Sequence, residues 1–569
     1  MLPENVKSRS TLASDLLFLG TLLIIFYTFW LGGYPLFTPD EGRYSEVARE
    51  MIASNDYITP RVNGVAFLDK PVLYYWLQAA AIKLFGLKEW ALRFFPAIFG
   101  IFGCLITYVC GRQLFDRRTG LLAAIILATS PLYFCGAHYA NLDLEVAVLI
   151  STSLLLFLTG VQNDGKYRSV ILLSAYISAA LAFLTKGLIG IVFPIMITGA
   201  WIFLLSNWKL LLRIHLLTGL MLIALIVFPW YYLVQQANPE FLHYFFVTQQ
   251  VTRFLSTTTF NNPTPVWFYL PIVLIGFFPW TSFLLQALTV NIRQAWQARF
   301  NHQAELFLLL WTGIVFIFFS VPHSKMITYI LPIFPPLALL VARYLSCTWQ
   351  ETTNRGIKLG KALAAIMSAD MIVFFVCAKQ NHWMNLPADF MPYLNIMMFI
   401  LLTQCLLILF LWRSKAARLF LLLVISNIFF LSMLTVGAKY LNQHSAKPLV
   451  TVLKTLRQGD EEVIHYFKFY QDIPLYLEKR VTIVADWSSP KIPYNDNWLR
   501  ELWYGMPFQN TSDWLITEEI FWQKWYGNKR VFVFVNQNYY DHFKKQASSY
   551  YFIAENDGIL LLSNKPTIS

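Results

Sequence analysis

Two adjacent carboxylates follow directly on the first long apolar run of the chain. Asp40 and Glu41 lie in the segment YPLFTPDEGRYSEVARE, residues 34–50, which comes just after LLFLGTLLIIFYTFWLGG. Thr38 can cap a helix that starts here, Pro39 suits its first turn, and Glu41 can complete a capping box. In the simplest interpretation, the two acids only complement the helix dipole. They can also orient or deprotonate an attacking group.

The residues after the two acids have the spacing of a helix with one apolar face. Apolar side chains recur at i, i+3 and i+4, and they are Tyr44, Val47, Ala48, Met51 and Ile52. Charged residues (Glu46, Arg49 and Glu50) occupy the rest of the helix surface. The pattern predicts an amphipathic helix that lies along the outer membrane surface.

Cations and polar aromatic residues occur in other segments that border apolar runs. They are Lys70 in FLDKPVLYYW, Lys186 in FLTKGLIG, Arg253 in VTRFLSTTTF, His323, Lys325 and Tyr329 in SVPHSKMITYILP, and His138 with Asp143 in AHYANLD. Each has a structural interpretation, such as a snorkelling lysine, an aromatic-belt tyrosine or a helix cap. A charge buried at a membrane edge is costly unless it is paired, however. Asp40, Glu41 and Asp143 are too few to pair with these cations, so the set predicts an anionic ligand, with phosphate the best candidate.

The composition places these residues in a membrane protein. The chain has 569 residues, of which 57% are hydrophobic and 13% are charged, whereas soluble proteins carry about 25% charged residues. Its net charge of +12 could indicate a nucleic-acid partner. Most basic residues lie in short loops between apolar runs, which indicates membrane topology and anionic lipid instead. The six cysteines lie in or beside apolar segments, so neither a disulfide framework nor metal-type spacing is expected.

Apolar runs of membrane-spanning length predict about thirteen transmembrane helices. The runs lie near residues 13–33, 92–111, 119–137, 143–160, 168–184, 187–205, 213–234, 266–289, 304–321, 327–346, 361–378, 391–411 and 417–436. Lysine and arginine recur in alternate loops, beginning with Lys7 and Arg9, which predicts a cytoplasmic N-terminus. The first run is long and lacks a small-residue cleavage site, so we expect a retained helix. An odd number of spans then places the C-terminus outside.

The chain divides into two expected domains. Residues 1–436 form a transmembrane domain with an amphipathic outer loop at residues 34–91. Residues 437–569 change sharply in composition, because β-rich runs such as RVTIVADW and RVFVFVN alternate with helical spacing in AKPLVTVLKTLRQ and TEEIFWQKW. We predict a polytopic α-helical membrane protein with an α/β domain outside the membrane.

Several motifs together resemble one enzyme family. PDEGRYSEVAREM, the DKP before an aromatic run, FLTKG, SKMITYILP and YFKFYQDIPLYLEKRVTIV are similar to bacterial lipid A 4-amino-4-deoxy-L-arabinose transferases. Those enzymes belong to the GT-C glycosyltransferases, which are related to protein O-mannosyltransferases. The resemblance extends over nearly the whole chain. It implies a GT-C fold of about thirteen spans with a C-terminal periplasmic α/β domain, in the bacterial inner membrane.

The resemblance also implies a reaction and roles for residues. A sugar leaves undecaprenyl phosphate with inversion and joins lipid A or another envelope glycolipid on the periplasmic side. By resemblance, Asp40 positions or deprotonates the acceptor, and Lys70, Arg253 and Tyr329 hold the lipid phosphate with help from Lys325. Three further carboxylates are candidates for sugar or metal contacts, namely Glu41, Asp69 and Asp143. Fixed cations near the departing oxygen would stabilise its growing charge.

The chain departs from the family pattern at several positions. Many relatives carry a Glu-His pair where this chain has Gln249 and Gln250, and relatives often have Glu at the position of Asp69. No cofactor is therefore assigned, and a divalent metal is left open. Aminoarabinose transferases often have Thr at the position of Gly42, so the sugar is also left open. The element ELWYG, residues 501–505, resembles the family without an evident physical role.

Two other functions remain as alternatives. A protein O-glycosyltransferase would use the same donor chemistry and would need Asp40 as a true base. A transporter or flippase of polyprenyl-linked sugars would place its ionisable residues near the bilayer midplane, between related half-repeats. Here the charges gather at one face and no repeat is evident. That arrangement favours catalysis at the membrane edge over transport.

Overall fold

A computed structural model describes residues 4–252, 264–352, 354–380, 386–442, 444–495 and 497–566. The chain forms two compact units. The first, which we call the helical unit, comprises Met1–Gly33, Arg93–Pro229 and Pro263–Leu441. The second, the mixed unit, comprises Tyr34–Leu92, Trp230–Asn262 and Asn442–Ser569. Three segments far apart in the sequence thus build each unit.

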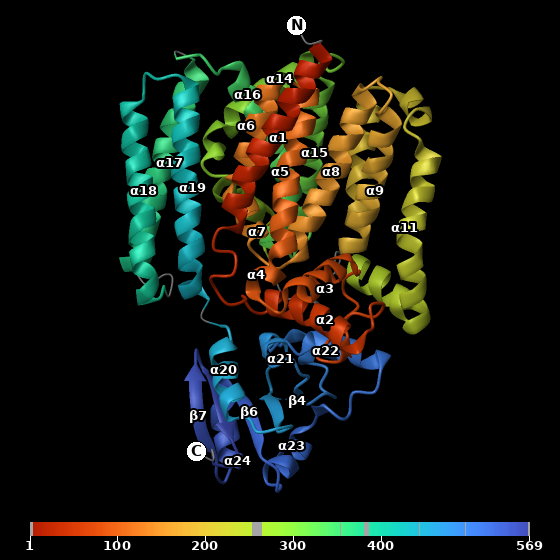
Figure 1. Ribbon diagram of the computed structural model, residues 1–569, viewed down its shortest axis with the longest axis vertical. Coiled ribbons are helices and arrows are strands. Elements are labelled where there is room, and N and C mark those ends of the chain that lie inside the picture. Colours follow the sequence, from red (N-terminus) through yellow and green to blue (C-terminus); the bar gives the residue numbers. More distant parts are fainter. Residues whose placement is uncertain are drawn as a thin grey trace. The chain divides into compact units, whose positions relative to one another are not determined.

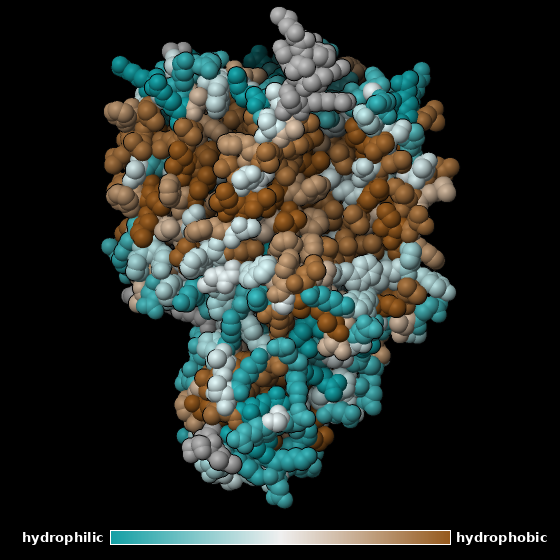
Figure 2. All heavy atoms as spheres, viewed as in Figure 1, coloured by the Kyte–Doolittle hydropathy of each residue, from teal (hydrophilic) through white to brown (hydrophobic). Residues whose placement is uncertain are grey.

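The helical unit is a bundle of long apolar helices (Figure 1). In chain order its helices are α1 (Glu4–Thr28), α5 (Phe94–Leu114), α6 (Arg117–Ala128), α7 (Pro131–Ala137), α8 (Leu142–Gln162), α9 (Arg168–Lys186), α10 (Ile189–Leu204), η1 (Trp208–Leu212), α11 (Leu216–Ala237, which continues into the mixed unit), η3 (Val266–Phe268), α13 (Tyr269–Gly276), η4 (Trp280–Phe283), α14 (Leu284–Gln297), α15 (Gln303–Ser320), η5 (Ile327–Ile333), α16 (Phe334–Cys347), α17 (Arg355–Gln380), η6 (Ala388–Phe390), α18 (Met391–Phe410) and α19 (Ala416–Leu441). Figure 2 shows a hydrophobic band across the visible face of these helices, bordered by hydrophilic residues at the end where α1 begins.

Among the described residues, ten helices are long and apolar enough to cross a membrane, or up to twelve if each of two bent pairs counts as one span. The predicted runs at 119–137 and 266–289 are these bent pairs, α6 with α7 at 67° and η3–α13 with η4–α14 at 104°. The run at 187–205 is the apolar helix α10, which has 16 residues and is shorter than a typical span. The prediction of a polytopic helical membrane protein is confirmed.

The breaks in the two bent pairs are held by one side chain of α19. Asn427 is buried and donates from Nδ2 to the carbonyl oxygens of Thr129 and, at 3.3 Å, Phe278. Trp280 adds a hydrogen bond of 3.0 Å from its indole nitrogen to the hydroxyl of Thr129. Broken helices survive at membrane depth only where protein groups satisfy the freed backbone. Asn427 therefore joins both breaks to α19.

Helix α17 packs against α18, and α18 packs against α19. Polar contacts also join these three helices. Lys361 of α17 is fully buried, and its ammonium group donates to the carbonyls at the end of α18, namely Leu411, Trp412 and Ser414, at 3.2, 2.9 and 2.7 Å. Gln404 of α18 contacts Ser368 of α17 at 2.8 Å and accepts from Ser426 of α19. These contacts cap α18 and link the three helices.

The mixed unit combines short helices with a six-stranded sheet. Its elements are α2 (Asp40–Ser54), β1 (Arg61–Val62), β2 (Val65–Ala66), α3 (Leu73–Phe85), α4 (Glu89–Leu92), η2 (His243–Thr252), α20 (Lys447–Leu456), β3 (Glu462–Tyr466), α21 (Asp472–Leu477), β4 (Thr482–Val484), η7 (Ile492–Tyr494), α22 (Arg500–Gly505), η8 (Met506–Phe508), β5 (Leu515–Ile516), α23 (Glu518–Trp525), β6 (Val531–Asn536), α24 (Gln537–Gln546), β7 (Tyr551–Asn556) and β8 (Ile559–Ser563). The sheet order is β5-β4-β3-β6-β8-β7. The first four strands are parallel, and β8 and β7 are antiparallel to their neighbours.

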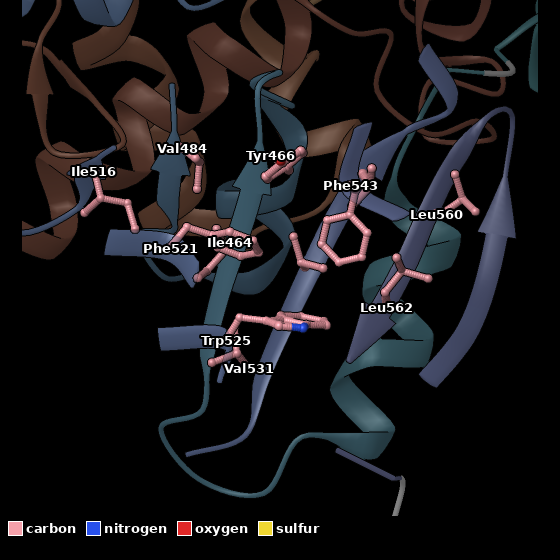
Figure 3. Packing of buried hydrophobic residues seen from close by; sticks show 12 residues of the cluster. Ile464, Tyr466, Val484, Ile516, Phe521, Trp525, Val531, Phe543, Leu560 and Leu562 are labelled. Atoms are coloured by element: carbon pink, nitrogen blue, oxygen red, sulfur yellow. The ribbon is translucent and has the colours of Figure 1, made fainter. Parts of the chain in front are cut away.

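The sheet forms where the sequence predicted strands. The central strand β6 has the run VFVFV, all of it buried, as expected of a parallel strand covered on both faces. Tyr466 and Val533 of the two central strands pack with Phe521 of α23 and Phe543 of α24 in one apolar cluster (Figure 3). The predicted α/β fold of the C-terminal region is therefore confirmed.

Helix α2 differs from the prediction at its start and on its polar face. Pro39 holds the N-cap position without a side-chain cap, and the hydroxyl of Thr38 donates instead to the carbonyl of His444 at 3.0 Å. The predicted capping role of Thr38 is wrong. Glu41 does reach back, and it accepts from the backbone nitrogen of Phe37 at 2.7 Å. Most of the charged face is buried within the unit.

The charges on α2 are satisfied inside the mixed unit. Arg49 donates to both oxygens of Glu46, at 2.6 and 2.7 Å. The carboxylate of Glu50 accepts from the backbone nitrogen of Gly64, at 2.7 and 2.9 Å. Burial of a charge is tolerated when it is paired and hydrogen-bonded. The Glu50 contact fixes α2 to the β1–β2 hairpin, and the Arg49–Glu46 pair links adjacent turns of α2.

Replacing Asn427 with Leu is expected to destabilise the helical unit by about 2 kcal/mol, because buried carbonyls at two helix breaks lose their donor. The measurement is thermal unfolding of the detergent-solubilised protein, followed by tryptophan fluorescence. Asn301→Leu is the matched control, because Asn301 is exposed and lies in the connection between α14 and α15. Equal melting temperatures for Asn427→Leu and the wild type would contradict the assigned role.

Candidate active site

Asp40 is held by an arginine that bridges two carboxylates. Arg43 lies one turn after Asp40 on α2, and its guanidinium forms ion pairs with Asp40 and with Glu501 of α22. Arg43 and Glu501 are buried, with 9% and 6% of their surface exposed. A guanidinium keeps its charge and its fork geometry when it is buried. Asp40 is therefore fixed in orientation by a buried charge network at the start of α2.

The ELWYG element acquires a role from this contact. Its first residue, Glu501, is the second carboxylate on Arg43. Its last residue, Gly505, lies so close to β2 that an added Cβ would stand 2.2 Å from the carbonyl oxygen of Ala66. Only glycine permits this approach, so the element places Glu501 by packing α22 against β2.

Gly42 is likewise in a close contact. An added Cβ at Gly42 would lie 3.0 Å from the backbone nitrogen of Asp472, at the start of α21, and 3.2 Å from its Cα. A threonine at this position would have to displace backbone. The departure from the family motif at Gly42 therefore fits the packing of α2 against α21 in this chain.

A second polar network surrounds Asp69. The hydroxyl of Tyr244 donates to Oδ1 of Asp69 at 2.6 Å, and the amide of Gln249 donates to the same oxygen at 3.1 Å. Gln249 also contacts the Tyr244 hydroxyl at 2.7 Å. Burial, with the nearby charge of Asp69, raises the pKa of Tyr244 well above its ordinary value, so the phenol stays neutral and donates.

The Asp69 network does not fit a divalent metal at Oδ1. Two donors already point at that oxygen, and Gln249 offers an amide N–H where a carboxylate ligand would be needed. Within the part of the chain that the structure describes, no group of three or more His, Cys, Asp or Glu side chains is arranged to hold a metal.

Lys70, which lies in the mixed unit with Glu41, contacts the Asp69 network. The ammonium group of Lys70 donates to the carbonyl of Asp69, at 3.2 Å. Tyr504 of α22 and Phe508 of η8 pack against the ring of Tyr244, with centroids 6.3 and 5.8 Å apart. The α22–η8 segment therefore contacts both the Arg43 network, through Glu501, and the Asp69 network.

The helical unit holds a separate ion pair. Lys186, the last residue of α9, pairs with Asp143 in the first turn of α8. The hydroxyl of Thr328 donates to the other oxygen of Asp143. The ammonium nitrogen of Lys186 also lies 4.0 Å from the ring centroid of Tyr329, a cation–π contact. The sequence predicted that Lys186 needs an anion, and Asp143 of the same unit supplies it.

Lys325 is occupied by backbone rather than by an acid. It is 3% exposed and donates to the carbonyls of Thr264 and Pro265, each at 3.2 Å. Burial lowers the pKa of Lys325 from its ordinary value. These contacts tie the segment after α15 to the start of η3. Arg253, and the side chain of Gln250, lie outside the described residues.

The predicted site residues thus fall into two sets. Asp40, Glu41, Asp69 and Lys70 lie in the mixed unit, and Asp143, Lys325 and Tyr329 lie in the helical unit. The excess of unpaired cations expected from the sequence is reduced, because Lys186 is paired with Asp143 and Lys325 with carbonyls.

Sequence reasoning missed three residues of these networks. Arg43 follows Asp40 by three positions, and that spacing on a helix is itself a signal of an ion pair. Tyr244 carries no local signal, and Glu501 is marked only as part of the ELWYG element; their partners could not be predicted, because they lie 175 and 458 residues away.

Comparisons with known proteins place this arrangement in a class. Residues 69–233 match the family model described as dolichyl-phosphate-mannose-protein mannosyltransferase. In its fold the chain is similar to the crystal structures of ArnT from Cupriavidus metallidurans. The form bound to undecaprenyl phosphate gives a TM-score of 0.84 at 24% identity, over 97% of this chain and 98% of that one. The apo form gives 0.83. The chain has the GT-C fold, with a transmembrane helical bundle and a C-terminal domain that contains a sheet.

The chain is also similar in sequence to curated arabinosyl transferases. The chain is 34% identical over 349 residues to the undecaprenyl phosphate-alpha-4-amino-4-deoxy-L-arabinose arabinosyl transferase of Edwardsiella ictaluri, a match that covers 61% of this chain and 60% of that protein. A similarly named protein of Sodalis glossinidius is 34% identical over 368 residues, with 62% and 64% covered. The matches span about three fifths of these relatives. The resemblance to aminoarabinose transferases is confirmed.

Replacing Gly505 with Ala is expected to destabilise the mixed unit by about 1–3 kcal/mol, because the new methyl group would overlap the carbonyl of Ala66 and push α22 from β2. Limited proteolysis and thermal unfolding of the purified chain measure the effect. Gly199→Ala is the control, because open space surrounds Gly199 within α10, and that change should be neutral or slightly stabilising. Wild-type protection of the mixed unit in Gly505→Ala would refute the packing role.

Proposed function

We propose that the chain is an inverting glycosyltransferase that uses a sugar carried on undecaprenyl phosphate. The sugar is 4-amino-4-deoxy-L-arabinose, and the acceptor is lipid A or a related envelope glycolipid. The main support is the agreement between a fold match along 97% of the chain to ArnT and curated relatives named for that donor. The motifs around Asp40 and Lys70 support the same family.

The proposed location is the bacterial inner membrane, with the N-terminus in the cytoplasm and the C-terminus in the periplasm. The helical unit has the length and composition of a multi-pass membrane protein. Basic residues recur in alternate loops, among them Arg117 and Arg118, Lys209 and Arg213, and Arg413 and Lys415, which supports this orientation. The reaction then takes place on the periplasmic side.

The proposed chemistry needs one fixed carboxylate beside the acceptor. An acceptor oxygen attacks the anomeric carbon from the face opposite the lipid phosphate. A new C–O bond forms as the bond to the phosphate breaks, and undecaprenyl phosphate leaves with the electron pair. An acceptor phosphate is already anionic and has no proton to lose, so Asp40 would orient it through shared donors or its sugar hydroxyls. Preorganised charge of this kind needs no rearrangement during reaction.

In the proposed mechanism, the two ion pairs of Arg43 restrict the orientation of the Asp40 carboxylate. With Glu501 on its other side, Arg43 cannot follow Asp40 if that carboxylate rotates, so the pair resists reorientation. Small misplacements of a reacting group are costly to rate. We assign Arg43 and Glu501 as positioning residues for Asp40.

Contacts to the donor phosphate are proposed from the resemblance. Lys70, Arg253 and Tyr329 are the residues assigned to it, with Lys325 as a further contact. The pairing of Lys325 with two carbonyls favours a structural part for that residue over a direct one. Glu41 and Asp143 accept from Phe37 and from Thr328, which favours positioning roles for both over sugar contact.

A protein O-glycosyltransferase is the second candidate. The match of residues 69–233 to the mannosyltransferase family model favours it specifically. A serine or threonine acceptor would have to lose its proton, and Asp40 would take it as a general base. Parallel assays with lipid A and with a serine-rich peptide, each with the same undecaprenyl-phosphate donor, separate the two functions by mass spectrometry of the products.

Asp40→Asn is expected to reduce sugar transfer by about 100-fold, because the amide loses the ion pair with Arg43 that fixes the orientation of the side chain at residue 40. Transfer from undecaprenyl-phosphate aminoarabinose to lipid A is measured by mass spectrometry on the purified protein. Asp460→Asn is the control, because Asp460 is exposed and pairs only with Lys479 among the described contacts. Undiminished turnover in Asp40→Asn would remove Asp40 from its role.

Glu501→Gln is expected to lower kcat by about tenfold with little change in KM for the donor, because Arg43 loses its second ion pair and Asp40 loses part of its restraint. Steady-state kinetics with varied donor give the two constants. Glu519→Gln, on the neighbouring helix α23, is the matched control. A change confined to KM in Glu501→Gln would argue against positioning through Arg43.

A further inference from the structure

A groove of about 900 Å³ lies in the helical unit, at the ends of three helices. It is formed at the start of α6, at the end of α16 and at the start of α19. Its lining includes three arginines and several apolar residues, among them Arg117, Arg118, Arg343, Leu121, Ile125 and Leu421. We call it the arginine groove. Asp143 and Lys186 belong to other helices and do not line it.

The three arginines differ in how far the protein neutralises them. Arg117 donates to both oxygens of Asp15, at 2.7 and 2.6 Å. Arg343 pairs with Asp116 at 3.3 Å. Arg118 is exposed and has no carboxylate within ion-pair distance among the described residues; its guanidinium lies 5.9 Å from the ring centroid of Trp349, which also lines the groove. Arg118 therefore gives the groove a positive charge that lies over an aromatic ring.

Two helix N-termini make this positive charge unfavourable without an anion. Arg117 and Arg118 are the first residues of α6, and Arg418 is in the first turn of α19, directly after Arg413 and Lys415. Neither first turn contains an acid; the acids beside the start of α6 are its cap, Asp116, and Asp15, and Asp15 pairs with Arg117. Cations are disfavoured where the helix dipole is positive, and an anion is favoured there. An anion would therefore be favourable at the starts of both α6 and α19.

The wall of the groove restricts what that anion can be. Leu421 is 58% exposed and lines the groove together with Leu121 and Ile125, which are half-buried. A free inorganic anion would leave this apolar wall uncovered. An anionic headgroup that carries an acyl chain matches both features, as basic pockets between transmembrane helices do for anionic lipids.

We propose that the arginine groove binds one anionic phospholipid. Its phosphate lies at Arg118 and at the starts of α6 and α19, and one acyl chain lies along Leu121, Ile125 and Leu421. The proposal is independent of the proposed transferase activity, because none of these residues belongs to the Asp40, Asp69 or Asp143 networks. The bound lipid would join α6 and α16 to α19, whose Asn427 holds the two helix breaks.

The test is a lipid titration of the full-length protein, delipidated in a neutral detergent and followed by native mass spectrometry. Phosphatidylglycerol is compared with phosphatidylcholine of identical acyl chains. We expect one phosphatidylglycerol to bind more tightly than phosphatidylcholine. Arg118→Gln should weaken phosphatidylglycerol binding about fivefold, the equivalent of one arginine near a lipid phosphate, and leave phosphatidylcholine unaffected. Arg118→Lys should retain most of the binding, because the charge remains.

Arg299→Gln is the matched control. Arg299 is exposed, lies over an aromatic ring (5.3 Å from the centroid of Phe300) and follows α14 outside the groove. The Arg299→Gln variant should bind phosphatidylglycerol as the wild type does. The proposal is overturned if Arg118→Gln binds phosphatidylglycerol like the wild type, if Arg299→Gln weakens binding equally, or if glycerol phosphate displaces the lipid at equal concentration. That last result would mean that the groove recognises the headgroup alone.

Discussion

Pairing of buried charges within the protein orders key contacts of both units. Removing an ion from water costs several kcal/mol unless a partner and hydrogen bonds offset it. Arg43 meets this requirement with two carboxylates, Lys186 with Asp143, and Lys361 with three backbone carbonyls. Each pairing also fixes geometry, because a guanidinium or ammonium group shared between elements holds those elements in one arrangement. The candidate catalytic carboxylate, Asp40, is positioned by such a pairing.

This requirement changes how the cations of the chain are interpreted. The sequence alone suggests a surplus of positive charge around the acids, and hence a phosphate ligand. Once Lys186 and Lys325 are matched to partners inside the protein, the argument for a phosphate rests on fewer residues and on the family resemblance. Arg118 is different, since its guanidinium lies over an aromatic ring and has no carboxylate within ion-pair distance among the described residues. Pairing therefore separates cations that support the fold from a cation that can recognise a ligand.

The spans and strands could be predicted because their signals are local. A run of about twenty apolar residues defines a helix in lipid, and VFVFV defines a covered strand. Lys186 could be predicted to need an anion, but not which one, because Asp143 is 43 residues away. The grouping of residues 34–92 with the C-terminal region, and the bridge from Arg43 to Glu501 across 458 residues, are set by tertiary packing. The bends after α6 and α13 depend on Asn427, whose type and position in an apolar run give no local indication.

The departure at Gln249 shows how one substitution can reset a polar site. Tyr244 and Gln249 both donate to one oxygen of Asp69, and the amide lies 3.1 Å from it. A glutamate at the same place would bring two carboxylates within hydrogen-bond distance, and like charges that close require a shared proton or a cation between them. The neutral amide supplies an N–H instead, so this oxygen of Asp69 is satisfied by the protein itself. Asp69 then acts as the acceptor that orders Tyr244 and η2 beside α22, and the segment that carries Glu501 is packed on the same tyrosine. Asp40 and Asp69 are thus ordered from one short helix of the C-terminal region.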